Sequence, residues 1–313
     1  MTSVTQRRSH TGKRRALGIR WTLAAALLTL AAAPARPFDL PPIAQSHRSE
    51  HHPGKLIWVE LATPDLESAK RFYGQLFGWT FSDAATSKHP YSIALLDGMP
   101  VAGLVQRPVP AGEHRQSAWL TFLSVRDVKA AEQAVTAHGG KVLSPPHAYP
   151  QRGSQAVFAD PQGAVFAVLQ SSSGDPPDVL AAPREWIWSS LHTRDPNTDA
   201  AFYQTVFGYE VFDATREGQE GFQHLVLGTD GYARASINLL PSDQHKRHPH
   251  WLNFVRVASP KEIAAKAEEL GGRVLVQPHP DRHGGLIALL ADPGGAPFGV
   301  IEWTDSDSQE RTP

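Results

Sequence analysis

Histidine is the side chain that most directly suggests chemistry in this sequence, because the chain has fifteen histidines and no cysteine. Imidazole binds metals and transfers protons near neutral pH. The absence of cysteine excludes disulfides, thiolate metal sites and cysteine nucleophiles. Most of the histidines lack the spacing of metal ligands. We expect three in a tail or linker and three in the solvated run QHKRHPH, namely His47, His51, His52, His245, His248 and His250.

Four other residues are candidates for acid–base or ligand chemistry. In an apolar cleft Glu60 would have a raised pKa and could act as a general base; the alternative is a structural or solvated carboxylate. His192 suggests a proton shuttle or a half-exposed cleft histidine. His147 and His279 end the matching runs SPPH and VQPH, which suggests either a shared ligand contact or a hydrogen bond within a loop.

A long internal repeat sets the frame for these residues. Residues 57–78 read IWVELATPDLESAKRFYGQLFG, and residues 187–208 read IWSSLHTRDPNTDAAFYQTVFG. The ends of the copies also match, with ADPQGAVFAV at 159–168 and ADPGGAPFGV at 291–300. A repeat of this length is a domain-sized module rather than a solenoid unit. The predicted parts are 1–36 (signal peptide), 37–54 (linker), 55–170 (module 1), 171–183 (linker), 184–303 (module 2) and 304–313 (tail).

The same order of elements is predicted in each module. In module 1 the pattern strand–Asp–helix–Gly occurs twice, which predicts two βαβββ halves. The aspartates at the turns, Asp65, Asp160, Asp195 and Asp292, are typical of helix caps and turn formers. The pairs Phe72-Tyr73 and Phe202-Tyr203 are typical of helix residues that pack into the core. The predicted elements of module 1 are a strand at 56–62, a helix at 66–76, strands near 91–96 and 101–106, a strand at 119–125, a helix at 128–138, and strands at 141–143, 155–159 and 164–169.

Composition gives no sign of a nucleic-acid or nucleotide partner, and the N-terminus indicates export. The net charge of −1 gives no basic footprint for nucleic acid, and no GxSxG elbow, Walker loop or dinucleotide glycine pattern occurs. A basic start, the apolar run Trp21–Ala35 and a small-residue site predict a secretory signal, with Arg14-Arg15 permitting the twin-arginine route. The alternatives are an uncleaved anchor or a misassigned start. We expect export to the periplasm or medium, with no stable membrane anchor after cleavage.

The paired βαβββ halves, FYxxxFG after the first helix and DPxGxxF before the last strand together resemble the vicinal oxygen chelate superfamily. This superfamily includes glyoxalase I, extradiol dioxygenases and the fosfomycin- and bleomycin-resistance proteins. The resemblance covers about residues 55–303. It implies an α+β fold of two tandem modules, each an eight-stranded half-barrel with a cleft for a small ligand.

The resemblance also indicates where a divalent metal would bind. Metal-dependent members use His, Gln or Glu seven residues before the aspartate that opens each half, and seven residues after the aspartate of DPxG. None of the six corresponding side chains here offers the imidazole, carboxylate or carbonyl that such cations require. They are Trp58, Leu120, Ala167, Trp188, Leu252 and Gly299. We therefore expect no metal cofactor at the usual position; a divalent metal held elsewhere is the alternative.

Strand alternation predicts what lines the clefts instead. Ile57, Val59 and Leu61 should face the helices, so the residues between them should face the cleft. Such aromatic surfaces with few polar groups are common in small-molecule pockets. The predicted cleft residues are Trp58, Glu60, Ala62, Leu120, Phe122 and Ser124 in module 1, and Trp188, Ser190, His192, Leu252, Phe254 and Arg256 in module 2.

These observations favour an exported protein that binds a small aromatic or amphipathic molecule. The alternative is a glyoxalase-like or dioxygenase-like enzyme (a lyase, isomerase or oxidoreductase), either metal-free with Glu60 as base or using an unrecognised metal site. A third possibility is that one module binds the ligand while the other stabilises the pair. The copies differ at matching positions, with Glu60 corresponding to Ser190 and Ser124 to Arg256. The fusion predicts a monomer or a weak homodimer.

Overall fold

The computed structural model of the chain describes residues 40–44, 50–84, 90–107, 116–218, 220–241, 248–282 and 284–303. The predicted signal peptide, the residues His47 and His245 and the tail 304–313 lie outside these ranges, so export stays a prediction. Within the described ranges no helix is both long and apolar enough to cross a bilayer. The described elements all belong to one compact unit, Phe38–Pro313.

Module 1 is an eight-stranded mixed sheet with strand order β2-β3-β4-β1-β5-β8-β7-β6. Strands β1 and β5 pair antiparallel at its centre, and each also pairs parallel with the last strand of its own half, β4 or β8. The elements are β1 (Leu56–Thr63), α1 (Leu66–Phe77), β2 (Thr80–Ala84), β3 (Tyr91–Leu96), β4 (Met99–Gln106), β5 (Ala118–Ser124), α2 (Val128–Ala137), β6 (Lys141–Tyr149), β7 (Gly153–Ala159) and β8 (Val165–Ser171).

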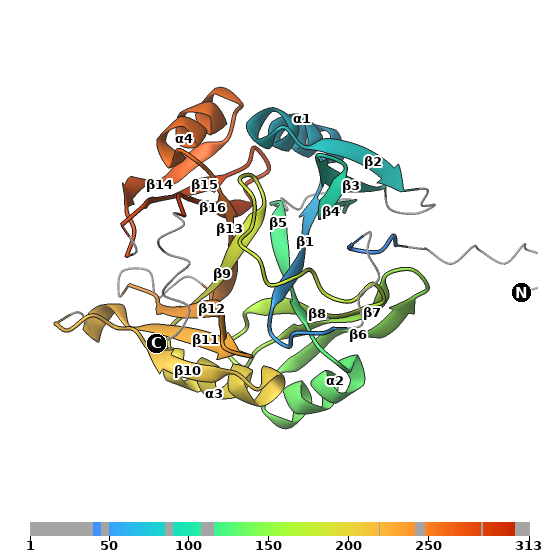
Figure 1. Ribbon diagram of the computed structural model, residues 1–313, viewed down its shortest axis with the longest axis vertical. Helices are drawn as coiled ribbons and strands as arrows, with labels where there is room; N and C mark the ends of the chain where they lie inside the picture. The colour runs from blue at the N-terminus through green and yellow to red at the C-terminus, as the bar shows by residue number, and fades with distance from the viewer. Residues whose placement is uncertain are drawn as a thin grey trace, which may run out of the picture. The chain divides into compact units, whose positions relative to one another are not determined.

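Module 2 repeats this topology in the order β10-β11-β12-β9-β13-β16-β15-β14. The two βαβββ halves per module confirm the predicted α+β architecture (Figure 1). The elements are β9 (Trp186–Thr193), α3 (Pro196–Phe207), β10 (Glu210–Asp213), η1 (Glu220–Phe222), β11 (His224–Thr229), β12 (Tyr232–Leu239), β13 (His250–Arg256), α4 (Pro260–Glu269), β14 (Arg273–Pro280), β15 (Leu286–Ala291) and β16 (Pro297–Ile301).

The aspartates of the repeat act as predicted. Asp65 and Asp195 precede α1 and α3, and each side chain accepts a hydrogen bond from the backbone N–H three residues on. At the other end, Gly78 and Gly208 adopt the left-handed conformation that closes a helix, with φ of 73° and 74°. The sequence therefore fixes where these helices begin and end by local chemistry alone.

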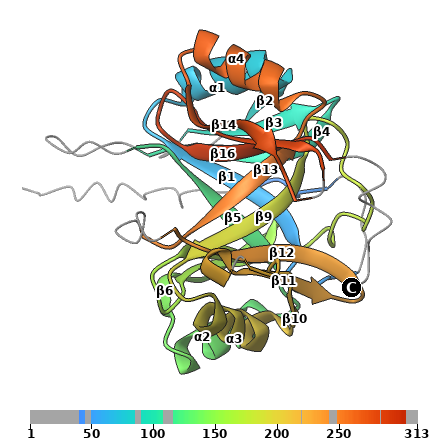
Figure 2. The same ribbon diagram turned by 90° about the vertical axis from the view of Figure 1, so that its left-hand side faces the viewer.

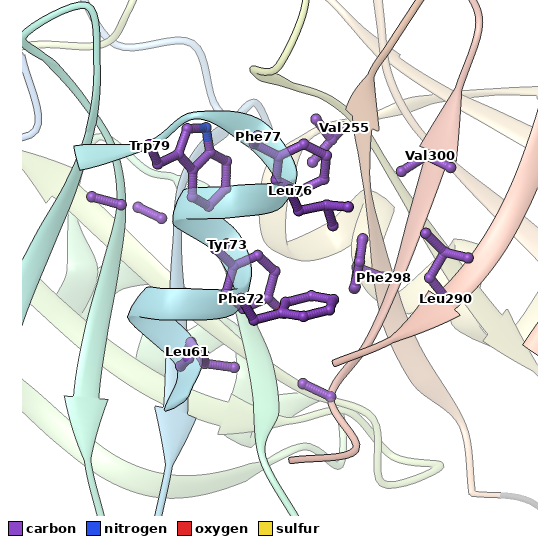
Figure 3. Close-up of a cluster of buried hydrophobic side chains, with 14 of the residues drawn as sticks. Leu61, Phe72, Tyr73, Leu76, Phe77, Trp79, Val255, Leu290, Phe298 and Val300 are labelled. Atoms are coloured by element: carbon purple, nitrogen blue, oxygen red, sulfur yellow. The ribbon is translucent and has the colours of Figure 1, made fainter. Parts of the chain in front are cut away.

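Each apolar core is built from both modules. Helix α1 packs against β16 and α4 of module 2, and α2 packs against α3, so the helices lie in two pairs on opposite sides of the strands (Figures 1 and 2). Figure 3 shows Phe72 and Tyr73 of α1 beside Phe298, with ring centroids 6.3 and 5.7 Å from it. The modules are therefore two repeats in sequence that share their cores in space.

Two matching chains of hydrogen bonds cross the boundary between the modules. The Trp119 indole N–H donates to the Tyr73 hydroxyl at 2.9 Å, and Tyr73 donates to the Asp292 carboxylate at 3.2 Å. In the other core, Trp251 donates to Tyr203, which donates to Asp160 at 3.0 Å. Packing of the Phe-Tyr pairs was predicted. Sequence reasoning missed that each tyrosine binds the DPxG aspartate of the other copy.

One buried carboxyl near this boundary has no counterpart in the other copy. Asp199 on α3 is buried, whereas the matching position on α1 holds Ala69. Burial, and then the charge of Asp160, raise the pKa of Asp199 to about 7, against smaller lowering effects of Thr193 and Gln162. The native state therefore resists ionisation of this group at neutral pH.

We expect Asp199→Ala to stabilise the protein above neutral pH. Because the native pKa of Asp199 lies above the unfolded value near 4, its contribution to stability is full below pH ~4 and is lost as pH rises through ~7. The variant should gain roughly 2–4 kcal/mol of unfolding free energy at pH 8 and little at pH 4. Urea unfolding at both pH values measures this gain. An equal gain at both would contradict the assignment, and Asp195→Ala, a lost helix cap, should destabilise at both.

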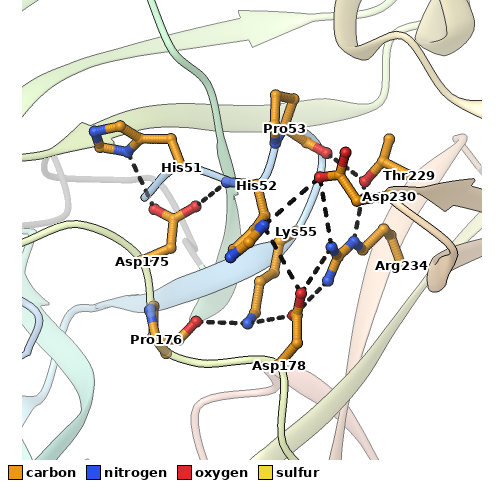
Figure 4. Close-up of polar contacts among 10 residues, drawn as sticks. All are labelled: His51, His52, Pro53, Lys55, Asp175, Pro176, Asp178, Thr229, Asp230 and Arg234. Carbon is orange, nitrogen blue, oxygen red and sulfur yellow. Dashed lines mark hydrogen bonds and ion pairs between the residues drawn. The ribbon is translucent and has the colours of Figure 1, made fainter. Parts of the chain in front are cut away.

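The segment between the modules is held by charges from both of them. Asp178 accepts hydrogen bonds from Lys55 of module 1 at 2.6 Å and from Arg234 of module 2 at 2.5 and 3.0 Å (Figure 4). Nearby, Asp175 accepts from the backbone N–H of His52 at 2.6 Å and pairs with the His51 ring. Residues 50–54 and 175–178, predicted to be linkers, therefore form a polar cluster that joins the modules, and His51 and His52 belong to it.

Candidate functional site

The half-barrel of module 2 encloses a cavity of about 1220 Å³. This volume exceeds the ~300–1,000 Å³ typical of pockets for drug-sized ligands. The cavity extends past residues 176–181 of the inter-module segment into module 1, where it reaches residues 43–44 and 55–59 and the Met99–Val101 edge. It has an apolar wall and a polar row. The apolar wall is formed by Trp188, Phe254, Ile287, Leu289, Ile301 and Trp303.

Two tryptophans give the apolar wall a flat surface. The rings of Trp188 on β9 and Trp303 after β16 lie 5.9 Å apart between centroids and are tilted by 35°. Trp188 is half-buried, so part of its ring is available to a ligand. Large aromatic faces bind flat or apolar molecules with little loss of side-chain entropy. Trp188 and Phe254, both predicted cleft residues, line this cavity.

The polar row crosses strands β9, β12 and β11 and adjoins this wall at Trp188. Ser236 is its centre: Trp188 donates its indole N–H to the Ser236 hydroxyl at 3.1 Å, and Ser190 shares a 2.7 Å hydrogen bond with it. The Asn238 amide donates to Ser236 at 3.4 Å, and its carbonyl lies 2.6 Å from His224 Nδ1. Neutral donors and acceptors of this kind orient a ligand without requiring it to be charged.

His192 lies at the end of the polar row. Its ring stacks on that of His250 with centroids 5.5 Å apart, so His250 is a strand residue and not part of a solvated loop as predicted. Burial, and then the neighbouring His250 and His224, lower the pKa of His192 to about 3. At neutral pH the imidazole is therefore uncharged, and it suits hydrogen bonding to a ligand better than proton transfer.

Module 1 has different side chains at the matching positions. The strand registers pair Glu60 with Gly103 where module 2 pairs Ser190 with Ser236, and Ala62 with Val105 where module 2 pairs His192 with Asn238. Tyr91 of β3 takes the place of His224. The two half-barrels thus share a backbone and differ in almost every polar group.

Glu60 lies on β1 in the half-barrel of module 1, and its role as a ligand-binding or catalytic residue stays a prediction. The Tyr91 hydroxyl donates to its carboxylate at 3.1 Å. Burial raises the pKa of Glu60, although the charge of Arg152 and the hydrogen bond from Tyr91 oppose the rise. The pair needs a glycine beside it, because a Cβ at Gly103 would lie 2.1 Å from the Tyr91 hydroxyl.

The other predicted cleft residues of module 1 form an apolar cluster. Trp58, Phe122 and Ala167 are buried there with Leu120 packed against them, and Leu40 and Ile43 from the segment before β1 complete the cluster. Ile57 belongs to this cluster, which corrects the prediction that it faces the helices. A register irregularity between Leu56 and Trp58 interrupts the alternation on which that prediction relied.

Three further predicted positions have structural roles. Arg256 donates to the backbone carbonyls of Ala181 and Trp303, so it anchors the chain around the cavity and is not among the residues that line it. Leu252 packs in the apolar cluster behind the wall. The Ser124 hydroxyl is buried without a hydrogen-bond partner among the described residues.

The matching histidines of the two copies are exposed on edge strands. His147 on β6 contacts the Tyr149 ring at 4.6 Å between centroids, and His279 on β14 lies 3.0 Å from the Gln277 carbonyl. The His279 contact is therefore with a backbone carbonyl two residues away in sequence. His279 also lies at the rim of the cavity.

The positions that would hold a metal in metal-dependent relatives of this fold do not suit one. The side chains of Trp58, Leu120 and Trp188 supply no lone pair for a divalent cation. At Gly299 a Cβ would lie 2.0 Å from the ring of Phe254, so Phe254 occupies the space that a ligand side chain at residue 299 would need. Among the described residues, no cluster of three or more His, Cys, Asp or Glu could hold an ion.

His224, Ser236 and Asn238 were missed by the sequence reasoning. They lie on β11 and β12, and alternation was applied only to the first strand of each half. The signal was present in the sequence. When β12 is aligned with β4, Ser236 corresponds to Gly103 and Asn238 corresponds to Val105. Polar residues that replace glycine and valine in one copy mark a divergent surface.

Comparisons with known proteins place this geometry in a family. The profile described as the Glyoxalase/Bleomycin resistance protein/Dioxygenase superfamily matches residues 55–168, and one described as a Glyoxalase-like domain matches residues 188–301. "Putative glyoxylase CFP32" of Mycobacterium tuberculosis is 30% identical over 257 residues, which are 82% of this chain and 97% of that protein. "Anthracycline biosynthesis protein DauV" of a Streptomyces species is 30% identical over 274 residues, which cover 80% of this chain and 94% of that protein.

The fold has counterparts among solved structures. The Mn(II)-bound glyoxalase from Novosphingobium aromaticivorans matches with a TM-score of 0.57 and 19% identity, over 81% of this chain and 83% of that one. The family profiles match both modules, the relatives cover most of the chain, and the solved structure shares its fold. The chain belongs to the Glyoxalase/Bleomycin resistance protein/Dioxygenase superfamily, as a member with two tandem modules.

Proposed function

We propose that module 2 binds a small organic molecule with a flat apolar body and neutral oxygen or nitrogen substituents. The observation that carries this proposal is the cavity of about 1220 Å³, which has a tryptophan-lined wall and a hydrogen-bonded polar row. The flat body would lie on Trp188 and Phe254. Its substituents would meet Ser190, Asn238 and His224.

Binding in this cavity uses no metal at the family's usual position. The indole, aliphatic and glycine positions described above support this part of the proposal, and the Phe254 ring over Gly299 supports it independently. The polar row supplies neutral groups, and charged side chains such as Lys55, Arg234 and Arg282 line other parts of the cavity. His192, whose pKa burial and two neighbouring histidines lower to about 3, adds an uncharged imidazole at neutral pH.

The names of the relatives are compatible with such a ligand. Two are named for anthracycline biosynthesis, and anthracyclines are fused-ring aromatic compounds with hydroxyl and carbonyl substituents. The enzymatic alternative, with Glu60 as general base, stays a prediction. In that case Glu60→Gln should abolish turnover and leave ligand affinity nearly intact.

Titration with a dihydroxyanthraquinone, followed by quenching of tryptophan fluorescence, tests the proposal. Ser236→Leu places an apolar side chain at the centre of the polar row, and we expect it to weaken binding by about 10- to 100-fold, or ~1.4–2.8 kcal/mol. Leu143→Ser, on β6 and 53% exposed, is the control and should bind like the parent. Equal affinity in the parent and Ser236→Leu would place the ligand elsewhere.

A further inference from the structure

The half-barrel of module 1 is closed by the chain itself. Residues 40–44 lie over its apolar cluster, visible as the short blue segment beside β1 in Figure 1. Leu40 and Ile43 are 2% and 4% exposed, and they bury their side chains with Trp58, Tyr91 and Phe122. Two apolar residues of an irregular segment therefore occupy the space that is a cavity in module 2.

A buried arginine holds this segment in place. Arg152, in the turn between β6 and β7, is fully buried. Its Nε donates to the backbone carbonyl of Pro41 at 2.6 Å, and its guanidinium lies 4.5 Å from the centre of the Trp58 ring. Burial of a guanidinium is costly unless its donors are satisfied. The Pro41 carbonyl therefore supplies a hydrogen-bond acceptor for the buried Arg152 guanidinium.

The site has more donors than the segment uses. Arg152 Nη1 and Nη2 and Trp58 Nε1 are buried and have no hydrogen-bond partner in good geometry among the described residues. All three are donors, so the missing groups are oxygen acceptors. Arg152 also lies near Tyr91 and Glu60; burial raises the pKa of both groups, and the charge of Arg152 opposes that rise. Two Nη atoms without an acceptor in good geometry still match the two oxygens of a carboxylate, and the strongest hydrogen bonds of a guanidinium are to charged acceptors. Pro41 supplies a single neutral oxygen.

Module 2 has no equivalent of this arginine. The register of β14 and β15 aligns Gly285 with Gly153, and each of these glycines lies against a backbone carbonyl of the last strand or the residue after it. Residue 284, a glycine, therefore corresponds to Arg152. The buried arginine beside a tryptophan is therefore a feature of module 1 alone, although other cations, among them Arg234 and Arg282, line the module 2 cavity.

We propose that module 1 contains a second ligand site, occupied in this structure by residues 40–43 as an internal competitor. Its external ligand is a molecule with a flat apolar body and a carboxylate. The body takes the place of Leu40 and Ile43 against Trp58 and Phe122, and the carboxylate takes the place of the Pro41 carbonyl on Arg152. Binding of such a ligand releases the segment, so the site reports occupancy through the accessibility of Ile43.

The absence of cysteine from the chain allows a direct test. In the full chain, Ile43→Cys introduces a single thiol at a position that is 4% exposed, and its rate of labelling by a thiol reagent measures release of the segment. Saturating 1-pyrenebutyrate should accelerate labelling at least 10-fold. The matching alcohol, 1-pyrenebutanol, should accelerate it far less. Leu143→Cys, at an exposed position, should label rapidly and equally under all conditions.

Two further variants separate this site from the module 2 cavity. Ser236→Leu in the Ile43→Cys chain should leave the acceleration intact, even where it abolishes binding in module 2. Arg152→Gln should raise the basal labelling rate and remove the difference between acid and alcohol. Labelling that pyrenebutyrate does not accelerate would overturn the proposed site. Equal acceleration by acid and alcohol would overturn the assigned ligand class, and loss of acceleration in Ser236→Leu would place the effect in module 2.

Discussion

Replacing Asp178 with alanine should lower the free energy of unfolding by about 3–5 kcal/mol, because it removes the carboxylate that two buried cations share. The side chains of Arg234 and Lys55 are only 3% and 14% exposed, and both hydrogen-bond to this carboxylate. In a unit of this size the loss corresponds to a fall in melting temperature of roughly 10 °C. Urea and thermal unfolding at pH 7 measure it.

The same carboxylate predicts a dependence on acid. Burial alone would raise the pKa of Asp178, but hydrogen bonds from Arg234 and Lys55, together with their charges, lower it to about 2. Its stabilising contribution is therefore complete above the unfolded pKa near 4 and is lost as pH falls towards 2. Asp178→Ala should lose less stability than the parent over that interval.

An exposed ion pair supplies the matched control for Asp178. Asp97 and Arg184 lie 3.6 Å apart with side chains 82% and 46% exposed. Water and salt screen such a pair, so Asp97→Ala should cost less than about 1 kcal/mol. If Asp178→Ala cost no more than Asp97→Ala, the cluster between the modules would be a surface feature and not the joint inferred from its burial.

Replacing Trp188 with alanine should strongly weaken ligand binding in module 2. The substitution removes the flat face of the cavity wall and the donor that fixes the Ser236 hydroxyl. We expect the affinity for the dihydroxyanthraquinone to fall by about 10- to 100-fold, equivalent to ~1.4–2.8 kcal/mol. Trp188→Phe keeps an aromatic face and loses only the indole N–H, so its loss should be less than ~10-fold. Titration calorimetry measures both.

A control for Trp188 must remove an aromatic ring that the cavity does not use. Phe222 on η1 is 58% exposed and does not line the cavity, so Phe222→Ala should bind like the parent. Unfolding of each variant in urea separates weakened binding from loss of fold. Equal affinities of Trp188→Ala and Phe222→Ala would exclude Trp188 from the binding surface.

The fold was predictable because its signals are local or repeated. The Asp65 cap and Gly78 stop delimit α1 with an error of one residue at its end, since both are set by backbone chemistry within a few positions. The short edge strand β2 and the full length of β6 were missed. Edge strands pair on one side only, so apolar alternation leaves little trace in sequences such as TFSDA. The shared cores could not be predicted either, because they depend on contacts between residues about 220 positions apart in sequence, such as Tyr73 and Asp292.

The site was predictable only in part. Alternation selected Trp188, Ser190 and Phe254, which line the module 2 cavity, because alternate residues of a strand lie on the same face of the sheet. It failed at Ile57, where a bulge shifts the parity, and at Arg256, which lies at the end of β13 and binds backbone carbonyls instead. Arg152 carried no signal at all. It lies in a turn, and only the fold brings it to Trp58 and Pro41.

The reciprocal tyrosine–aspartate pairs bear on the origin of the chain. Tyr73 reaches Asp292 and Tyr203 reaches Asp160, which is the exchange expected across a twofold axis relating two identical subunits. A single-module ancestor with this pairing would have depended on its own concentration to stay folded. Gene fusion removes that dependence and the requirement for identical subunits. One half-barrel was then free to keep an open cavity, while in the other a buried arginine holds residues 40–43 over the apolar cluster.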